Sequence, residues 1–269
     1  MLSYLPKRNA IVAYVDFDAM RRTGILKMIA GSKAAEELEY QQFVDQTLFD
    51  YRQDLDAAAL AFKDDQVFFV LRGRFHWKNI LDYAVHQGGS CHNGFCTVDG
   101  SRPQRRISFY ALRPNLMAMA SGKDDYGASQ VNRNSGAPAL VPSEKPVWVF
   151  VPAAAVRSAG TLPDAIKPYA VALRNADELT FSIGPREDHL ELSLEVTCKD
   201  AVSASTLLVD LESTTNALRK MIEREQKTPG PGDLTAVLVS GTFSRNERRV
   251  YGEWPIPRAF VDSFTGEAY

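Results

Sequence analysis

Along the first half of this chain, short continuous apolar segments alternate with segments whose apolar residues are three or four positions apart. The run at residues 10–15 is typical of a strand, and Phe17 and Met20, three positions apart, predict one helical turn after it. Ser32 can cap a second helix that fades near Thr47. The pattern then predicts strands at 57–62 and 67–75 around the four-residue turn 63–66, a helix at 76–87, and strands at 90–98, 105–112 and 116–120.

The second half shows the same order of elements. We predict a strand at 147–151, a helix at 164–173, and strands at 179–184 and 189–197 around the polar turn 185–188. A long helix at 200–226 follows, and the Thr-Pro-Gly-Pro-Gly segment 228–232 ends it. Strands at 235–243 and 249–254 close this half as a hairpin.

A short sequence match connects the halves, because residues 12–24 resemble residues 148–160. Four residues recur at an offset of 136: Val15, Ala19, Arg21 and Gly24 return as Val151, Ala155, Arg157 and Gly160. Since the flanking elements also keep their order, the sequence predicts an internal duplication. We expect an α+β fold of two similar β-α-β-β-α-β-β halves, with a largely antiparallel sheet and helices packed on one face. The first repeat would span 1–120, a connecting segment 121–145, and the second repeat 146–269.

Composition and charge exclude several classes of protein. Of the 269 residues, 45% are hydrophobic and 24% are charged, as in ordinary globular proteins, and the net charge is −2. We expect no nucleic-acid partner, because a chain without a basic footprint cannot displace the counterions of nucleic acid. No apolar run reaches the roughly 18 residues of a transmembrane helix, and the opening residues lack a secretory signal, although a removed leader would leave no trace. We therefore expect a soluble protein without a transmembrane segment.

Cys91 and Cys96 bracket the strongest hairpin signal in the chain, the dipeptide Asn93-Gly94. With these two residues as the loop, the cysteines oppose each other in a non-hydrogen-bonded pair, whose spacing suits a disulfide. The alternative is a pair of reduced thiols, as expected in the cytosol. Cys198 stays unpaired in either case, and we expect it to be a buried small residue.

A metal site is a weaker interpretation of the same region. His86, Cys91, His92 and Cys96 are ligand types that zinc accepts. Their spacing lacks a second tight ligand pair, and strand alternation directs His92 away from Cys91. We therefore predict no metal and no other cofactor.

The candidate ligand-binding residues are Asp16, Arg72, Arg74 and His92. Asp16 lies near Asp18, and paired carboxylates can do acid-base chemistry. The second repeat lacks both carboxylates, so a helix cap is the simpler role for Asp16. Arg72 and Arg74 would share one face of a strand, with residues 105–106 on a possible neighbour. Such guanidinium groups can hold a carboxylate or phosphate, although a solvated charged face is the alternative.

Several segments resemble a family of uncharacterised bacterial proteins that often carry an export or lipoprotein leader. The resemblance lies in residues 5–16, residues 40–62 followed by Arg-Gly-Arg-Phe at 72–75, the Gly88-Gly89 pair, and Val-Trp-Val-Phe-Val at 147–151. It implies an α+β fold and an extracytoplasmic location. It implies no catalytic residues, and the leader typical of that family is absent from this sequence.

No motif in the chain assigns a reaction. The sequence lacks a G-x-S-x-G elbow, a Walker loop, a G-x-G-x-x-G turn, H-E-x-x-H and C-x-x-C. We therefore predict a non-catalytic binding or interaction protein of the bacterial envelope, whose partner is a protein or a small molecule. The alternative is a hydrolase with its site at the junction of the two halves, where pockets commonly form.

Overall fold

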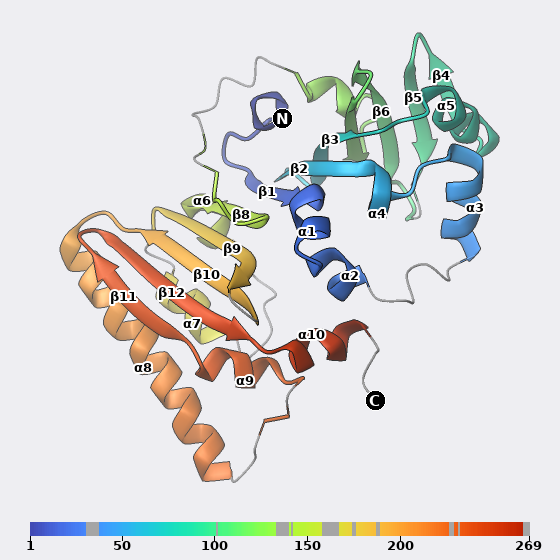
Figure 1. The fold of residues 1–269 in the computed structure, drawn as a ribbon. Coiled ribbons are helices and arrows are strands. Elements are labelled where there is room, and N and C mark those ends of the chain that lie inside the picture. The colour runs from blue at the N-terminus through green and yellow to red at the C-terminus, as the bar shows by residue number, and fades with distance from the viewer. Residues whose placement is uncertain are drawn as a thin grey trace. The chain divides into compact units, whose positions relative to one another are not determined.

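The computed structural model describes residues 1–30, 38–100, 102–132, 140, 142–157, 167–173, 176–186, 189–225, 229–230 and 232–265. The chain forms two compact units, Met1–Pro142 (unit 1) and Ser143–Tyr269 (unit 2). Each unit contains antiparallel strands and helices, so the fold is α+β as predicted (Figure 1).

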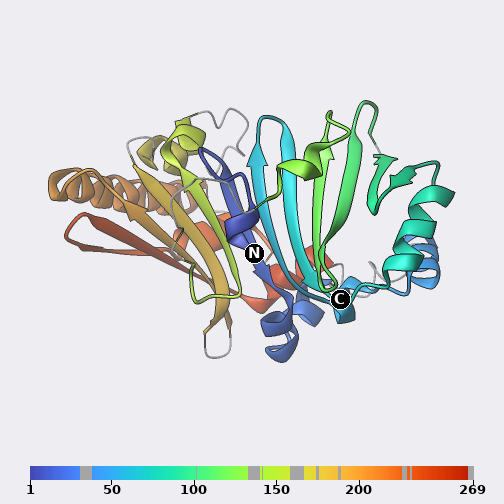
Figure 2. The ribbon, with the colours of Figure 1, turned by 90° about the horizontal axis from the view of Figure 1, so that it is seen from above.

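The strands of unit 1 lie in the order β1-β2-β3-β7-β6-β5-β4, and neighbours pair antiparallel. Their bounds are β1 Ile11–Asp16, β2 Leu55–Lys63, β3 Gln66–Gly73, β4 Ser90–His92, β5 Phe95–Asp99, β6 Arg106–Arg113 and β7 Leu116–Gly122. The helices are η1 Leu2–Tyr4, α1 Phe17–Arg22, α2 Ile25–Ala30, α3 Leu38–Thr47, α4 Tyr51–Asp54, α5 Trp77–His86 and η3 Gly127–Gln130. Figure 2 shows these strands edge to edge.

Both faces of the unit 1 sheet are covered, whereas the sequence predicted helices on one face. On one face α5 packs on a buried cluster: Ile80, Ala84, Cys96, Phe109 and Met117. Ser108 and Tyr110 alternate with Phe109 and therefore point to the other face. There the Ser108 Oγ accepts from the Ala128 amide of η3 at 2.9 Å, and the Tyr110 hydroxyl donates to the Val131 carbonyl at 2.9 Å.

The turn between β2 and β3 is tighter than predicted. Lys63 and Gln66 form a register pair, so only Asp64 and Asp65 remain in the loop. Both have positive φ, 50° and 59°, as a type I′ hairpin turn requires. The predicted four-residue turn was wrong because the strand ladder extends through its two outer residues.

The strands of unit 2 lie in the order β8-β9-β10-β12-β11, also with antiparallel pairing. Their bounds are β8 Val147–Pro152, β9 Glu178–Arg186, β10 His189–Thr197, β11 Thr242–Asn246 and β12 Arg249–Ile256. The helices are α6 Ala153–Arg157, α7 Lys167–Ala172, α8 Ala201–Glu225, α9 Leu234–Val239 and α10 Arg258–Thr265. Helices α7 and α8 lie on one side of this sheet (Figure 1). The apolar stripe of α8 buries Ala204, Leu207 and Leu211.

The predicted strand at 235–243 is wrong over most of its length, because residues 234–239 form helix α9. Asp233 caps this helix by accepting from the Thr235 amide at 2.8 Å. Arg219 of α8 donates to the carbonyls of Val239 and Gly241 at 2.8 and 3.4 Å. A short apolar run fits a strand or a buried helix equally well. Here the Asp233 cap and the two hydrogen bonds from Arg219 favour the helix.

Two predicted helix starts fall outside the described residues, at Ser32 and at position 164. Helix α3 is described from Leu38 and α7 from Lys167. Within the predicted connecting segment 121–145, β7 continues to Gly122, and the 3-10 helix η3 occupies 127–130.

Candidate ligand-binding site

An open pocket of about 380 Å³ lies in unit 1, where β3 and β6 end and β7 begins. Its walls come from these strand ends, from η1 and from the residue before it: Met1, Ser3, Tyr4, Arg72, Arg113, Asn115 and Leu116. The volume lies within the range of about 300–1,000 Å³ that is usual for small-molecule pockets. Since two guanidinium groups, an amide and two hydroxyls line it, the pocket is rich in hydrogen-bond donors.

Arg72 and Arg113 lie on the same face of the sheet, on either side of Leu116. The register pairs Arg72 with Leu116 on one side and Arg113 with Leu116 on the other. Directly opposed residues point to the same face, and strands are spaced by about 4.8 Å, so the two arginine Cα atoms lie roughly 10 Å apart. Both long side chains can therefore reach a ligand above Leu116.

A β-bulge places Arg113 at this position. The register shifts between Ala111 and Arg113, so Leu112 is left over and Arg113 pairs with Leu116. The loop that follows is Pro114-Asn115, and proline holds φ near −65°. Type I′ and II′ turns need positive φ at that position, so a two-residue loop of this composition cannot form them, and a bulge adjusts the register instead. The sequence did not indicate Arg113, because this residue lies beyond the predicted strand 105–112 and simple alternation does not foresee such a bulge.

The strand ends around the pocket are held by short contacts. The Gly73 amide donates to the Asn115 carbonyl at 3.1 Å, and the Trp77 indole donates to the Pro114 carbonyl at 2.7 Å. A Cβ at Gly73 would lie 2.3 Å from the Asp54 carbonyl oxygen, so only glycine fits there. These contacts fix the backbone on both sides of Arg72.

The pocket carries uncompensated positive charge. Among the described residues, neither Arg72 nor Arg113 has an acidic partner, and the lining contains no carboxylate. The positive charges of Arg72, Arg113 and Lys7 also act together on the amino group of Met1. Its pKa is lowered, first by burial and then by these three charges. The site therefore favours a negatively charged group.

Asp16 is a helix cap in the structure. Its Oδ1 accepts from the Ala19 amide at 2.8 Å at the start of α1. The register places Asp16 opposite Ala57, which is in turn opposite Arg72, so one strand separates the two charged residues. Asp16 does not line the pocket.

Arg74 lies apart from Arg72, contrary to the prediction that both share one strand face. Strand β3 ends at Gly73, and the Arg74 side chain pairs with Asp54, with its Nη2 at 3.0 Å from the Asp54 Oδ1. It also donates to the Gln53 carbonyl. Arg74 therefore fastens α4 to the end of β3.

His92 and the other predicted arginines also lie outside the pocket. His92 is exposed on β4, and strands β7, β6 and β5 separate it from β3. We expected Arg106 on a strand next to β3, but Arg106 lies on β6, and β7 separates β6 from β3. Its side chain pairs with Asp99 and Asp125. Of the four candidate residues, only Arg72 lines the pocket.

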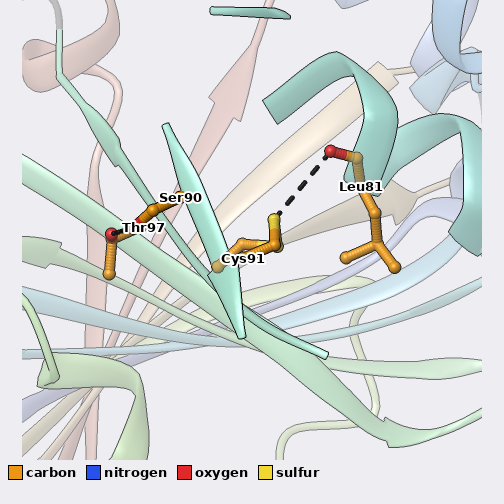
Figure 3. The surroundings of a disulfide bond; sticks show 5 residues. Leu81, Ser90, Cys91 and Thr97 are labelled. Carbon is orange, nitrogen blue, oxygen red and sulfur yellow. Dashed lines mark hydrogen bonds between the residues drawn. A yellow bond between two sulfur atoms is a disulfide. The ribbon is translucent and has the colours of Figure 1, made fainter. Parts of the chain in front are cut away.

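The β4–β5 hairpin carries a disulfide between Cys91 and Cys96, whose Cα atoms are 4.1 Å apart. The predicted register is confirmed: Cys91 opposes Cys96, and Asn93 and Gly94 form the turn with φ of 50° and 79°. Figure 3 shows the Cys91 sulfur facing the Leu81 carbonyl of α5, at 3.9 Å. The bond thus lies against the helix that covers this face of the sheet.

The weaker zinc interpretation concerned His86, Cys91, His92 and Cys96, two of which form the disulfide. Within the described parts of the chain, no three potential metal-ligating side chains come together. Cys198 is buried at the end of β10, and burial raises the pKa of its thiol.

No protein-family model matches this chain, and no curated protein matches it in sequence. In fold it is similar to the crystal structures of TP0453 in forms III, I and IV, with TM-scores of 0.55, 0.50 and 0.52. The sequence identities are 11%, 11% and 12%, over 99%, 98% and 98% of this chain and 97%, 96% and 96% of the other. At this identity the likeness shows the fold alone. Among the described helices, none is both long and apolar enough to cross a bilayer.

Unit 2 contains a charged cluster that differs from the pocket because its members are paired. Glu191 is buried on β10 and accepts from Lys145 at 2.8 Å and from Arg186. Burial opposes its ionisation, but the hydrogen bonds from Lys145 and Arg186 outweigh this and lower the pKa of Glu191. Lys145 also donates to the Ser193 hydroxyl. The cluster holds strand β10 to the segment before β8.

Proposed function

We propose that this chain is a non-catalytic binding protein and that its ligand is a small molecule held in the arginine-lined pocket of unit 1. The observation that carries the proposal is the pair Arg72 and Arg113, which face one open volume of about 380 Å³ without acidic partners among the described residues. A guanidinium group donates hydrogen bonds but does not release or accept a proton near neutral pH. Such a lining orients and holds a ligand.

Native mass spectrometry of the full chain, purified from the cells that make it, tests this role. We expect a small molecule that stays bound to the wild type and is lost from the double variant R72Q/R113Q. The matched control is R102Q, since Arg102 is an exposed arginine of the same unit outside the pocket lining. A wild-type chain without a bound molecule, or a double variant that retains it, contradicts the proposal.

We further propose that the protein works in an oxidising compartment such as the bacterial envelope. The disulfide Cys91–Cys96 supports this, because such bonds persist outside the cytosol and are rare within it. The sequence contains three cysteines, so a native chain with the bond intact exposes one thiol, Cys198, after denaturation. Thiol counting on protein trapped with alkylating reagent before lysis should give one. A count of three would place the chain in a reducing compartment.

We also propose that the two units descend from one duplicated ancestor. Without the β4–β5 hairpin, the order β1-β2-β3-β7-β6 corresponds to β8-β9-β10-β12-β11. Strand β1 and the start of α1 correspond to β8 and the start of α6 at the offset of the sequence match: 11–16 with 147–152, and 17 with 153. Sequence profiles built from related chains for either half should detect the other half. Failure to do so across divergent relatives would speak against common descent.

A further inference from the structure

We propose that the pocket binds a small organic dianion, a phosphate monoester or a dicarboxylate, and that Arg72 and Arg113 each contact one side of it. This inference rests on the proposed function and names the ligand class of the same site. The shared chemistry is two negative charges on a molecule small enough for about 380 Å³.

Charge is the first argument for a dianion. The two lining arginines contribute two positive charges, the amino group of Met1 lies beside them, and no carboxylate among the described lining residues offsets them. Elsewhere in unit 1, two half-buried arginines have acidic partners: Arg52 pairs with Asp50, and Arg106 with Asp99 and Asp125. Arg72 and Arg113 face one volume without acidic partners among the described residues, so their charges repel each other, and a ligand with two negative charges removes that repulsion.

Nearby carboxylates are already engaged and cannot serve as internal substitutes. Asp16 lies in the same row of the sheet as Arg72, but it caps α1 and lies across β2 from Arg72. Asp54 contacts Arg74 on the other side of Gly73. The positive field of the pocket therefore acts on whatever enters it.

Geometry is the second argument. The arginine Cα atoms lie roughly 10 Å apart across Leu116, so their guanidinium groups approach a ligand from opposite sides. This spacing suits a molecule whose charges or oxygens face two directions. The side-chain amide of Asn115 adds a further donor to the lining, and among the described residues only its backbone carbonyl is hydrogen-bonded, by the Gly73 amide.

The walls beside these donors are apolar or aromatic. Leu116 forms the floor between the arginines, and the Tyr4 side chain comes from η1. Such surfaces accommodate a short carbon skeleton, so an organic dianion fits better than a bare ion. Contacts at Gly73 and Pro114 hold the backbone beside Arg72 and Arg113 before the ligand arrives, so no backbone ordering opposes binding there.

Isothermal titration calorimetry of the full chain tests the inference with four probes: glycerol 3-phosphate, succinate, inorganic phosphate and acetate. We expect glycerol 3-phosphate or succinate to bind at least about tenfold more tightly than the monoanion acetate, and the tighter of the two identifies the source of the charge. R72Q and R113Q should each weaken that binding by about tenfold or more, as expected when a charged hydrogen-bonding partner is lost. R102Q, which removes the same charge outside the pocket, should bind like the wild type.

The result that overturns the inference is equal binding of acetate and the organic dianions, or dianion binding that R72Q and R113Q leave unchanged. Binding of inorganic phosphate alone also overturns it, since that result needs no organic skeleton. Thermal unfolding of each variant shows whether it is folded, and N115A offers a second variant that changes no charge and should weaken the dianion more than acetate.

Failure here is distinguishable from failure of the proposed function. If native mass spectrometry finds a neutral or cationic molecule that depends on Arg72 and Arg113, the binding role stands and the dianion is wrong. If neither a cellular molecule nor any probe depends on these arginines, both are wrong.

Discussion

Replacing Asp50 by asparagine tests how the fold supports the edge of the pocket. The buried carboxylate of Asp50 accepts from the Tyr40 hydroxyl at 2.7 Å and from the Arg52 backbone amide at 2.9 Å, and the Arg52 guanidinium also donates to it at 2.7 Å. Asp50 thereby caps α4, whose last residue, Asp54, accepts from the Arg74 amide and abuts Gly73. The cluster is connected through α4 to the strand end that carries the pocket.

The magnitude follows from the pKa of Asp50, which is lowered from 3.8 to about 2. Burial alone would raise it, but hydrogen bonds from Arg52 and Tyr40 and the charge of Arg52 outweigh burial. A depressed folded-state pKa means that the unfolded chain binds more protons in this range, so the stabilisation is present above about pH 4 and is lost as the pH falls through 2. The shift corresponds to about 2 kcal/mol of folding free energy.

Urea unfolding between pH 7 and pH 2, followed by hydrogen exchange of unit 1 peptides, measures this contribution. D50N should be less stable than the wild type by about 2 kcal/mol at pH 7, and the difference should shrink below about pH 4. The control is D45N, because Asp45 is exposed on α3 and should follow the wild type at every pH. A difference between D50N and wild type that stays constant down to pH 2 would refute the electrostatic explanation.

Three further predictions concern single features of unit 1. Reducing the Cys91–Cys96 bond, which closes a loop of sequence separation 5, should lower the free energy of unfolding by about 2 kcal/mol, and identical urea midpoints with and without reductant would contradict this. G73A should lower the free energy of unfolding by about 1–3 kcal/mol and weaken ligand binding in calorimetry, because the added Cβ would lie 2.3 Å from the Asp54 carbonyl oxygen. A wild-type free energy of unfolding would show that the backbone shifts there at little cost. D16A should cost about 1 kcal/mol in thermal unfolding while D16S stays close to wild type, and a loss of ligand binding in D16S would argue for a role beyond capping.

Local patterns predicted most strands of this fold because each strand carries its own apolar alternation and turn. The hairpin at Asn93-Gly94 was predicted with its register, since that dipeptide selects a two-residue turn with positive φ. Helix α9 was mistaken for a strand although the Asp233 cap beside it is a local helix signal. The other deciding contacts come from Arg219, 20 and 22 residues away from their acceptors, and such distant contacts leave no local pattern.

The candidate site was predicted only in part for a related reason. Arg72 follows from its own strand, whereas Arg113 reaches the same face through the bulge at Leu112. Period-two alternation assigns Arg113 to the opposite face, and only the pairing with Leu116 reverses that assignment. The prediction that Arg74 shares the strand face of Arg72 was wrong because β3 ends one residue earlier, where the Asp54 carbonyl approaches Gly73. Both errors arise where two backbone segments meet, and the sequence of one segment alone does not show how it contacts the other.

The disulfide has a physical reason to lie in the β4–β5 hairpin. Strand β4 has three residues and, among the described strands, pairs with β5 alone at the edge of the unit 1 sheet, so few backbone hydrogen bonds hold it. A short edge hairpin of this kind is marginally stable by itself. The covalent bond restricts its unfolded conformations, and Cys96 is fully buried in the cluster under α5, which fixes the hairpin to the core. Because the unit 2 sheet lacks a counterpart of this hairpin among its described strands, the bond stabilises the part of unit 1 that the shared strand order does not include.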